Sequence, residues 1–211
     1  MKYLTIDLFK AMLQRALEHI REHEDEYSRL DAILGDGDHG TAMVTAFSAA
    51  VKASEGATEF NSMLNDMGFG IMLETSGSTS TLLGAFFLGM SDHASGNQLD
   101  AGAVKSMFSG GLANVEKQTQ ARKGDKTMMD ALIPAVEAMQ ASVSDDISEL
   151  FQAAAKAAAE GAAQTVHMKA NYGRARNYGE RSIGHADSGA TSWSGIFCAF
   201  APPNPLKGGH Y

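Results

Sequence analysis

Apolar residues recur at helical spacing along almost the whole chain, while the alternation typical of β-strands is nearly absent. The first segment shows this spacing in Leu8, Phe9, Met12, Leu13, Ala16, Leu17 and Ile20. Polar residues and glycines divide the rest of the chain into further predicted helices, at about 41–53, 58–74, 79–91, 98–120, 127–141, 145–170 and 188–200. About eight helices with short connections favour antiparallel neighbours, so the sequence predicts an all-α, up-and-down bundle.

Length and composition narrow the class of protein. A chain of 211 residues is long enough to bury a full core, and we expect one domain over residues 1–211 with a tail at about 202–211. No apolar run resembles a signal core or reaches the ~20 residues of a membrane span, so a cytoplasmic protein without a membrane partner is expected. The formal net charge of -8 argues against a nucleic-acid partner. The single cysteine, Cys198, is expected to be a buried and inert thiol.

Small and flexible side chains are expected in the core. The alanine-rich stretch 152–163 would let neighbouring helices approach closely. Twelve methionines suit an adaptable core. Core packing is the favoured interpretation, and contact with an adenine ring the alternative, for Met63, Met67, Met128 and Met129.

Three carboxylates and an imidazole crowd into residues 30–40, which also hold three glycines. The acids are Asp31, Asp36 and Asp38, and His39 follows them. Carboxylates this close repel one another unless a cation lies between them. Mg²⁺ prefers oxygen ligands and commonly binds through a few carboxylates and the phosphates of a substrate. The segment is therefore interpreted as a metal-bridged phosphate site, and a nucleotide is the first ligand to consider.

The same segment fits two other interpretations. Gly35, Gly37 and Gly40 match the dinucleotide fingerprint G-x-G-x-x-G, but that motif requires a preceding strand, and the segment upstream has helical spacing. The second alternative is a purely structural turn in which Asp38 or Thr41 caps the next helix. Three acids are more than a helix cap needs, which favours the metal site.

Three more polar segments with glycines separate predicted helices. Residues 76–80 carry small hydroxyl side chains that either cap the next helix or present donors to an anion. In the segment 124–127, Lys126 either meets a phosphate or pairs with an acid while its neighbours cap the helix. The long segment 173–189 contains Arg174, whose planar fork suits a phosphate or a ribose. Long loops inside compact domains are more often functional than idle.

These motifs follow one another in a set order. They are Asp31-x4-Asp36-Gly37-Asp38-His39-Gly40, Ser78-Thr79 before Gly84-Ala85-Phe86-Phe87, Gly124-Asp125-Lys126-Thr127-Met128, Gly173-Arg174-Ala175, and Gly179-Glu180-Arg181-Ser182-Ile183-Gly184-His185. The series resembles the nucleotide-binding L subunit of dihydroxyacetone kinase over nearly the entire chain. The resemblance implies an all-helical barrel of eight antiparallel helices, with a nucleotide held at one mouth through two Mg²⁺ ions.

The resemblance also implies a role for each matching residue. Asp31, Asp36 and Asp38 match the ligands that bridge the Mg²⁺ ions to the phosphates. The positions that match nucleotide contacts are His39, Gly40, Thr41, Ala42, Ser78, Thr79, Thr119, Met128, Arg174, Asp187, Ser188 and Gly189. No catalytic base is expected among them, because phosphoryl transfer mainly needs positioning and neutralisation of the phosphates.

The implied activity is transfer of a phosphoryl group from a Mg²⁺-bound adenine nucleotide, ADP or ATP, to dihydroxyacetone or a related keto-sugar. A separate K-type partner subunit would hold that sugar. Two donors remain open, namely free ATP, or a permanently bound ADP recharged by a phosphohistidine carrier of the sugar phosphotransferase system. The alternative function is a non-catalytic protein whose bound nucleotide regulates a partner such as a transcription factor.

Four positions depart from the pattern of the family. Ser76 stands where a glycine is usual, Thr79 and Ser80 replace a Ser-Gly pair, and Ser188 replaces the usual proline. These changes are expected to affect the contacts to phosphate and the retention of ADP.

Overall fold

The computed structural model describes residues 1–202, so the predicted tail lies outside the described residues apart from Pro202. In this part the chain forms nine α-helices, two 3-10 helices and one antiparallel pair of short strands. The elements are β1 (Leu4–Thr5), α1 (Ile6–Glu22), α2 (Glu24–Leu34), α3 (His39–Ser54), α4 (Phe60–Glu74), α5 (Ser78–Ser91), β2 (Gln98–Leu99), α6 (Ala101–Gln118), α7 (Met129–Ala141), α8 (Ile147–Gln164), η1 (Thr165–His167), η2 (Arg174–Ser182) and α9 (Ser188–Phe200).

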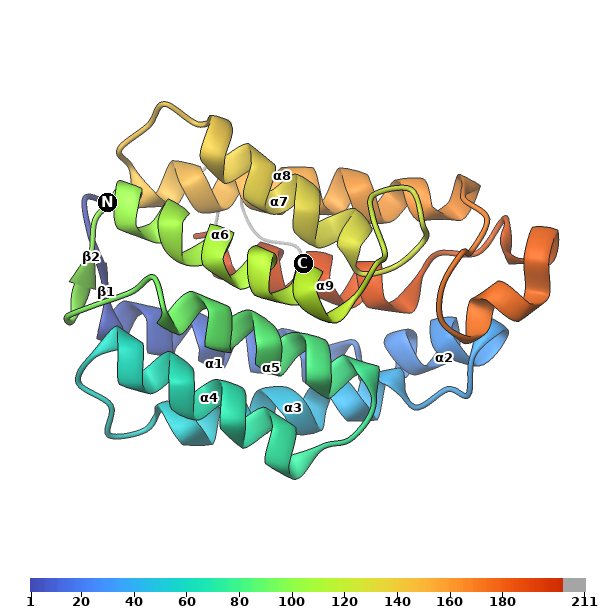
Figure 1. Ribbon diagram of the computed structural model, residues 1–211, viewed down its shortest axis with the longest axis horizontal. Helices are drawn as coiled ribbons and strands as arrows, with labels where there is room; N and C mark the ends of the chain where they lie inside the picture. The colour runs from blue at the N-terminus through green and yellow to red at the C-terminus, as the bar shows by residue number, and fades with distance from the viewer. Residues whose placement is uncertain (203–211) are drawn as a thin grey trace.

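Eight of these helices close into a ring. Helix α1 packs on α3, each helix from α3 onward packs on the next, and α9 packs back on α1. Successive helices run in opposite directions along the long axis of the molecule (Figure 1). Helix α2 lies outside the ring, against α3, α9 and η2 at one end of it. The predicted all-α barrel of eight antiparallel helices is confirmed, with α2 as an additional element.

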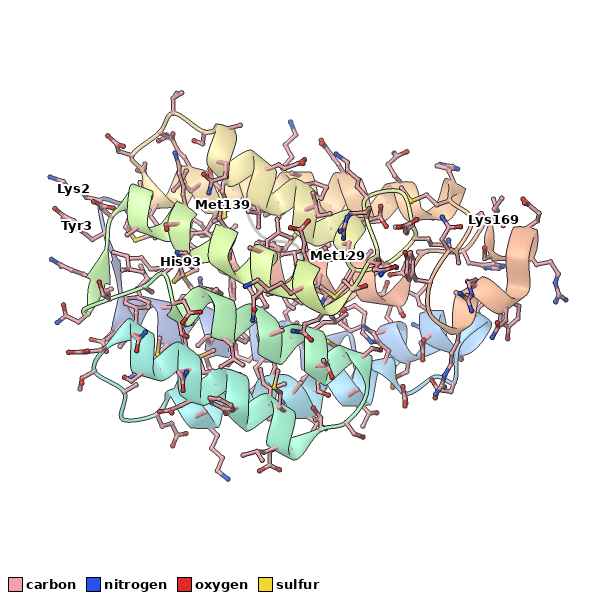
Figure 2. The ribbon with its side chains drawn as sticks, in the orientation of Figure 1. Lys2, Tyr3, His93, Met129, Met139 and Lys169 are labelled. Atoms are coloured by element: carbon pink, nitrogen blue, oxygen red, sulfur yellow. The ribbon has the colours of Figure 1, made fainter. Side chains whose placement is uncertain are left out.

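The two ends of the barrel differ. The β1–β2 pair lies at one end and the α2 and η2 segments at the other (Figure 1). Figure 2 shows Lys2 and Tyr3 at the strand end and Lys169 at the opposite end. Helices α3, α5, α7 and α9 all begin at the α2 end, so four helix N-termini point that way. Because a helix N-terminus carries partial positive charge and unpaired N–H groups, this end favours an anionic ligand.

Aromatic, methionine and alanine side chains fill the barrel. Phe86 packs edge-on against Trp193 at 5.1 Å between ring centroids. The prediction that Met63, Met67 and Met129 lie in the core is confirmed, since all three are fully buried. The alanine-rich helix α8 packs closely on both α7 and α9, as its composition predicts.

The structure corrects the predicted helices in three places. Residues 24–34, which lead into the aspartate-rich segment, form a separate helix, α2, which buries only Tyr27 and Leu34. Helix α6 begins only after Asp100, whose side chain accepts from the N–H of Ala103 at 2.8 Å. The predicted helix 145–170 ends earlier, because α8 gives way to the 3-10 helix η1.

The prediction for Cys198 is wrong, because its side chain is exposed. Helix α9 buries Ile196, Phe197 and Phe200, and Cys198 falls on the opposite face of the helix. An apolar run in a helix therefore does not bury every residue in it. Within the described chain, no helix combines the length and apolar character needed to cross a membrane.

Candidate functional site

A cavity of about 410 Å³ opens at the α2 end of the barrel. Its lining includes all the predicted site residues except Gly40 and Thr41, namely Asp31, Asp36, Asp38, His39, Ala42, Ser78, Thr79, Thr119, Met128, Arg174, Asp187, Ser188 and Gly189. These residues come from segments spread over most of the sequence. The barrel therefore brings the predicted site together in one place.

The three aspartates gather around the turn between α2 and α3. One carboxylate oxygen from each of Asp31, Asp36 and Asp38 lies within 4.8 Å of the others. Asp38 occupies the N-cap position of α3, yet its side chain makes no capping hydrogen bond. The alternative in which Asp38 serves as a helix cap is therefore wrong. Oxygen donors in this arrangement fit a hard divalent cation such as Mg²⁺.

Two glycines allow the turn to fold around Asp31. The Asp31 carboxylate accepts from the N–H of Gly37 at 2.8 Å, and Gly37 adopts a φ of 80°. A Cβ on Gly35 would lie 2.4 Å from Asp31 Oδ1, so any side chain there would push the carboxylate away. The segment before these glycines is the helix α2, which rules out the strand required by the dinucleotide fingerprint.

Gly40 and Thr41 hold α2 against α3 and do not line the cavity. A Cβ on Gly40 would lie 2.1 Å from the carbonyl oxygen of Glu24, so the two helices touch at this point. The Thr41 hydroxyl donates to the Glu24 carboxylate at 3.0 Å. In this structure both residues therefore support the acidic turn from behind.

Helix α5 begins at the cavity with the hydroxyl residues Ser78 and Thr79. Its N-cap is Gly77, at φ 97°, which offers no side chain for capping. The hydroxyls of Ser80 and Thr81 both donate to the Gly77 carbonyl, at 3.0 and 2.9 Å. The first turn of α5 therefore lies at the cavity with N–H groups that no side chain caps, as an anion site requires.

His39 lies buried at the back of the cavity and contacts two hydroxyl groups. Its Nε2 lies 2.8 Å from Ser192 Oγ, and its Nδ1 lies 3.3 Å from Thr79 Oγ1. Burial lowers the pKa of His39, and the negative charge of Asp31 opposes this shift. The imidazole is therefore neutral near pH 7 and connects the first turns of α5 and α9.

Arg174 and Asp36 form an ion pair across the cavity mouth. Both side chains remain substantially exposed. Gly173, at φ 63°, precedes Arg174 and turns the chain into η2. A residue predicted to contact the nucleotide thus lies beside a residue predicted to bind the metal.

Lys126 lines the cavity, and its ammonium group bonds to backbone carbonyl groups and not to a carboxylate. Its ammonium group is almost completely buried and donates to the carbonyl of Thr165 at 2.5 Å and to the carbonyl of His185. Burial lowers the pKa of Lys126, while Asp187 and Asp130 favour its charged form. Lys126 therefore joins the 124–127 turn to the loops that precede α9.

Two buried or half-buried acids hold the loops around Lys126. Asp130 accepts from the N–H groups of Gly124, at 2.5 Å, and Thr127, at 2.9 Å. Asp187 caps α9 by accepting from the N–H of Ala190 at 2.7 Å. Burial raises the pKa of Asp187 to about 7, against the effects of the Ala190 hydrogen bond and of the charge on Lys126.

The profile of the DAK2 domain family matches residues 33–202. This chain belongs to the DAK2 domain family of dihydroxyacetone kinase subunits. It is 34% identical over 185 residues to the ADP-binding subunit DhaL of PEP-dependent dihydroxyacetone kinase 1 from Listeria innocua, which covers 86% of this chain and 88% of that protein. It is 37% identical to the corresponding DhaL subunit from Escherichia coli, over 80% of this chain and 83% of the relative.

Solved structures show the same DAK2 fold. The dihydroxyacetone kinase of C. freundii superposes with a TM-score of 0.72 at 23% identity, over 92% of this chain and 34% of that one. The complex of that kinase with AMP-PNP and Mg²⁺ matches with the same TM-score of 0.72. The DAK2 chain described here thus spans about a third of the length of that larger kinase.

Of the residues in the apolar wall of the cavity, the sequence analysis of this DAK2 domain named only Thr119 and Met128. Beside Thr119 and Met128, that wall includes Leu34, Leu82, Ala121, Tyr172 and Trp193. Helical spacing is the signal that finds three of these residues, because Leu34, Leu82 and Trp193 follow predicted site residues by one helical turn and share their helix face. The cavity therefore combines apolar lining with charged lining.

Proposed function

We propose that this chain carries an adenine nucleotide, ADP or ATP, with Mg²⁺ at the mouth of its barrel and transfers a phosphoryl group to a small keto-sugar held by a partner subunit. The observation that carries the proposal is the convergence of three carboxylates, an arginine, a helix N-terminus and an apolar wall on one cavity. A charged side and a dry side are what a nucleotide with phosphates and a planar base requires.

In this proposal the metal is held by Asp31, Asp36 and Asp38. Their carboxylate oxygens converge, and the Asp38 carboxylate makes no capping hydrogen bond to α3 that would compete with a metal. Bound Mg²⁺ would neutralise the charge of the phosphates. Two ions are proposed, since Mg²⁺ usually binds proteins through only one or two carboxylates and three are gathered here.

The chain's own residues position the nucleotide. Arg174 and the first turn of α5 bind the phosphates, the former through a charged fork and the latter through backbone N–H groups. Met128, Leu82 and Trp193 exclude water from the base. No residue of the chain is assigned as a base, because phosphoryl transfer depends on positioning and on neutralised charge.

The acceptor is proposed to be dihydroxyacetone bound to a K-type subunit. Relatives of similar length are named as DhaL subunits of PEP-dependent or PTS-dependent dihydroxyacetone kinases. These names favour a bound ADP that is recharged by a phosphohistidine carrier over free ATP. The D-erythrulose kinase of Mycolicibacterium smegmatis is 35% identical over 83% of this chain and 31% of that protein, which keeps related keto-sugars in the proposed class.

Calorimetric titration of ADP into metal-stripped protein, with and without Mg²⁺, tests the proposal. We expect binding that requires Mg²⁺ and that is lost in Asp36→Asn. Asp92→Asn is the matched control, because Asp92 is an exposed acid that follows α5 at the other end of the barrel. Activity with a purified K-type subunit and phosphoryl donor then tests the transfer step.

Equal ADP affinity with and without Mg²⁺ would contradict the proposed metal site. Phosphoryl transfer retained by Asp36→Asn at the rate of the control would contradict its assigned role. Far-ultraviolet circular dichroism of both variants shows that the barrel remains helical, so that a loss of binding is not a loss of folding.

A further inference from the structure

A buried serine lies behind the cavity and is linked to it through His39. Ser192 is fully buried in the first turns of α9 and does not line the cavity. Its hydroxyl oxygen lies 2.8 Å from His39 Nε2 and 3.0 Å from the carbonyl oxygen of Gly189. The other ring nitrogen, Nδ1, lies 3.3 Å from the hydroxyl of Thr79, which does line the cavity.

The chemistry of these groups sets the direction of the hydrogen bonds. A carbonyl oxygen can only accept, so the single proton of the Ser192 hydroxyl points to Gly189. The Ser192 oxygen then accepts from Nε2–H of His39. A neutral imidazole with a proton on Nε2 has an acceptor at Nδ1, so the Thr79 hydroxyl donates to it. The reverse direction would take the Ser192 proton away from the Gly189 carbonyl and free the Thr79 proton for the cavity, so a hydrogen bond inside the protein would be exchanged for one to solvent.

We propose that Ser192 is a positioning residue of the nucleotide site, which fixes His39 in its Nε2–H tautomer and thereby turns the proton of Thr79 away from the cavity. Thr79 then faces the ligand as a hydrogen-bond acceptor. It receives a donor, such as a metal-bound water or a ligand hydroxyl, and does not donate to a phosphate oxygen. The role toward a nucleotide rests on the function proposed above.

This assignment gives different hydrogen-bonding roles to the neighbouring hydroxyls of Ser78 and Thr79. Ser78 and the N–H groups of α5 are left as the donors to phosphate, while Thr79 accepts. We call the chain of hydrogen bonds from Thr79 through His39 and Ser192 to Gly189 the relay. The relay also couples α5 and α9, because Thr79 lies in the first turn of α5 and Gly189 in the first turn of α9. Such a coupling explains why a polar serine is fully buried at this position.

Nitrogen-15 NMR of the histidine rings in the protein free of nucleotide and metal measures the tautomer directly. A spectrum of His39→Asn serves only to assign the His39 signals. We expect a protonated Nε2 and an unprotonated Nδ1 in the wild type, and a mixture of tautomers in Ser192→Ala. Ser194→Ala is the control, because Ser194 is a buried serine of the same helix that makes no contact with His39 among the described hydrogen bonds.

A wild-type ring protonated on Nδ1 would overturn the proposal, as would an unchanged tautomer in Ser192→Ala. If Ser192→Ala does not fold, Thr79→Val replaces it: removal of the donor to Nδ1 is expected to shift that nitrogen's signal, and an unchanged signal also overturns the relay. These spectra need no ligand, so they stand even if the chain does not bind ADP.

Titration of ADP and Mg²⁺ tests the link to the nucleotide. We expect Ser192→Ala to weaken binding about three- to tenfold, as the loss of one oriented hydrogen bond predicts. The control Ser194→Ala is expected to bind as the wild type does. An unchanged affinity together with a changed tautomer would overturn the positioning role while leaving the nucleotide site itself in place.

Discussion

Arg174 and Asp36 form an ion pair at the cavity mouth, so the same contact engages one residue assigned to the phosphates and one assigned to the metal. When a metal and a nucleotide bind, the ion pair must therefore break, and Asp36 and Arg174 then contact the metal and the phosphates. Both side chains are exposed enough for the exchange to occur without opening the barrel.

Replacement of Arg174 by alanine is expected to have opposite effects on the two ligands. Affinity for ADP with Mg²⁺ should fall about tenfold, because a charge-assisted contact to phosphate is lost. Affinity for Mg²⁺ alone should rise, since Asp36 no longer has a competing cation. Calorimetry measures both constants, with Arg176→Ala from the same 3-10 helix as the control. A change of the same sign for both ligands would disprove the exchange.

Gly35→Ala tests the geometry of the acidic turn. A Cβ at this position meets Asp31 Oδ1 at 2.4 Å, so the carboxylate must move. We expect weaker Mg²⁺-dependent binding of ADP with little change in helix content. Gly102→Ala, where the nearest atom lies at 3.5 Å, is the matched control and should bind normally. Equal binding by both variants would show that the position of Asp31 is not critical.

The raised pKa of Asp187 predicts that the stability of the fold depends on pH. Its pKa is raised from 3.8 to about 7, so the folded chain holds a proton that the unfolded chain releases. The free energy of unfolding should therefore fall as pH rises between about 4 and about 7 through this group. Asp187→Asn keeps a side-chain acceptor for the Ala190 N–H and removes the titration.

Denaturant unfolding of the metal-free protein measures this effect. We expect Asp187→Asn to gain stability relative to the wild type between about pH 5 and about pH 8. A difference between the two proteins that stays constant over this range would contradict the raised pKa of Asp187.

Ser188→Pro is expected to stabilise the fold. Ser188 is the first residue of α9, where a proline fits because the N–H of that position needs no helical partner. The preceding residue, Asp187, has φ -79° and ψ 128°, which is the extended conformation that a following proline prefers. A gain of about 0.4–1 kcal/mol in the free energy of unfolding is expected, measured by denaturant titration. A loss of stability would indicate that the Ser188 N–H has an essential partner.

The helices of the barrel could be predicted because their apolar faces are buried in one common core. Met63 and Met67 lie where their spacing predicts. Residues 24–34 show helical spacing but were not predicted as a separate helix, and α2 lies outside the ring and buries only two residues, Tyr27 and Leu34. An element that packs on the end of a barrel buries too few residues for its apolar spacing to indicate where it begins and ends.

The cavity residues could be predicted from motifs, but their connections could not. The burial of Lys126 depends on carbonyl groups of Thr165 and His185, which are distant in sequence. The hydrogen bonds of His39 likewise join three helices. Such contacts form only when the ring of helices closes. The spacing of residues along the sequence carries no information about that closure.

The end of the barrel opposite the cavity is a place where another protein module can be inserted. The connections at residues 55–59, 92–100 and 142–146 contribute no residue to the cavity in the described chain. Val143 is fully exposed in the last of these turns. A fluorescent or affinity module inserted in the 142–146 connection would not contact the ligand, because the length of the helices separates the module from the site.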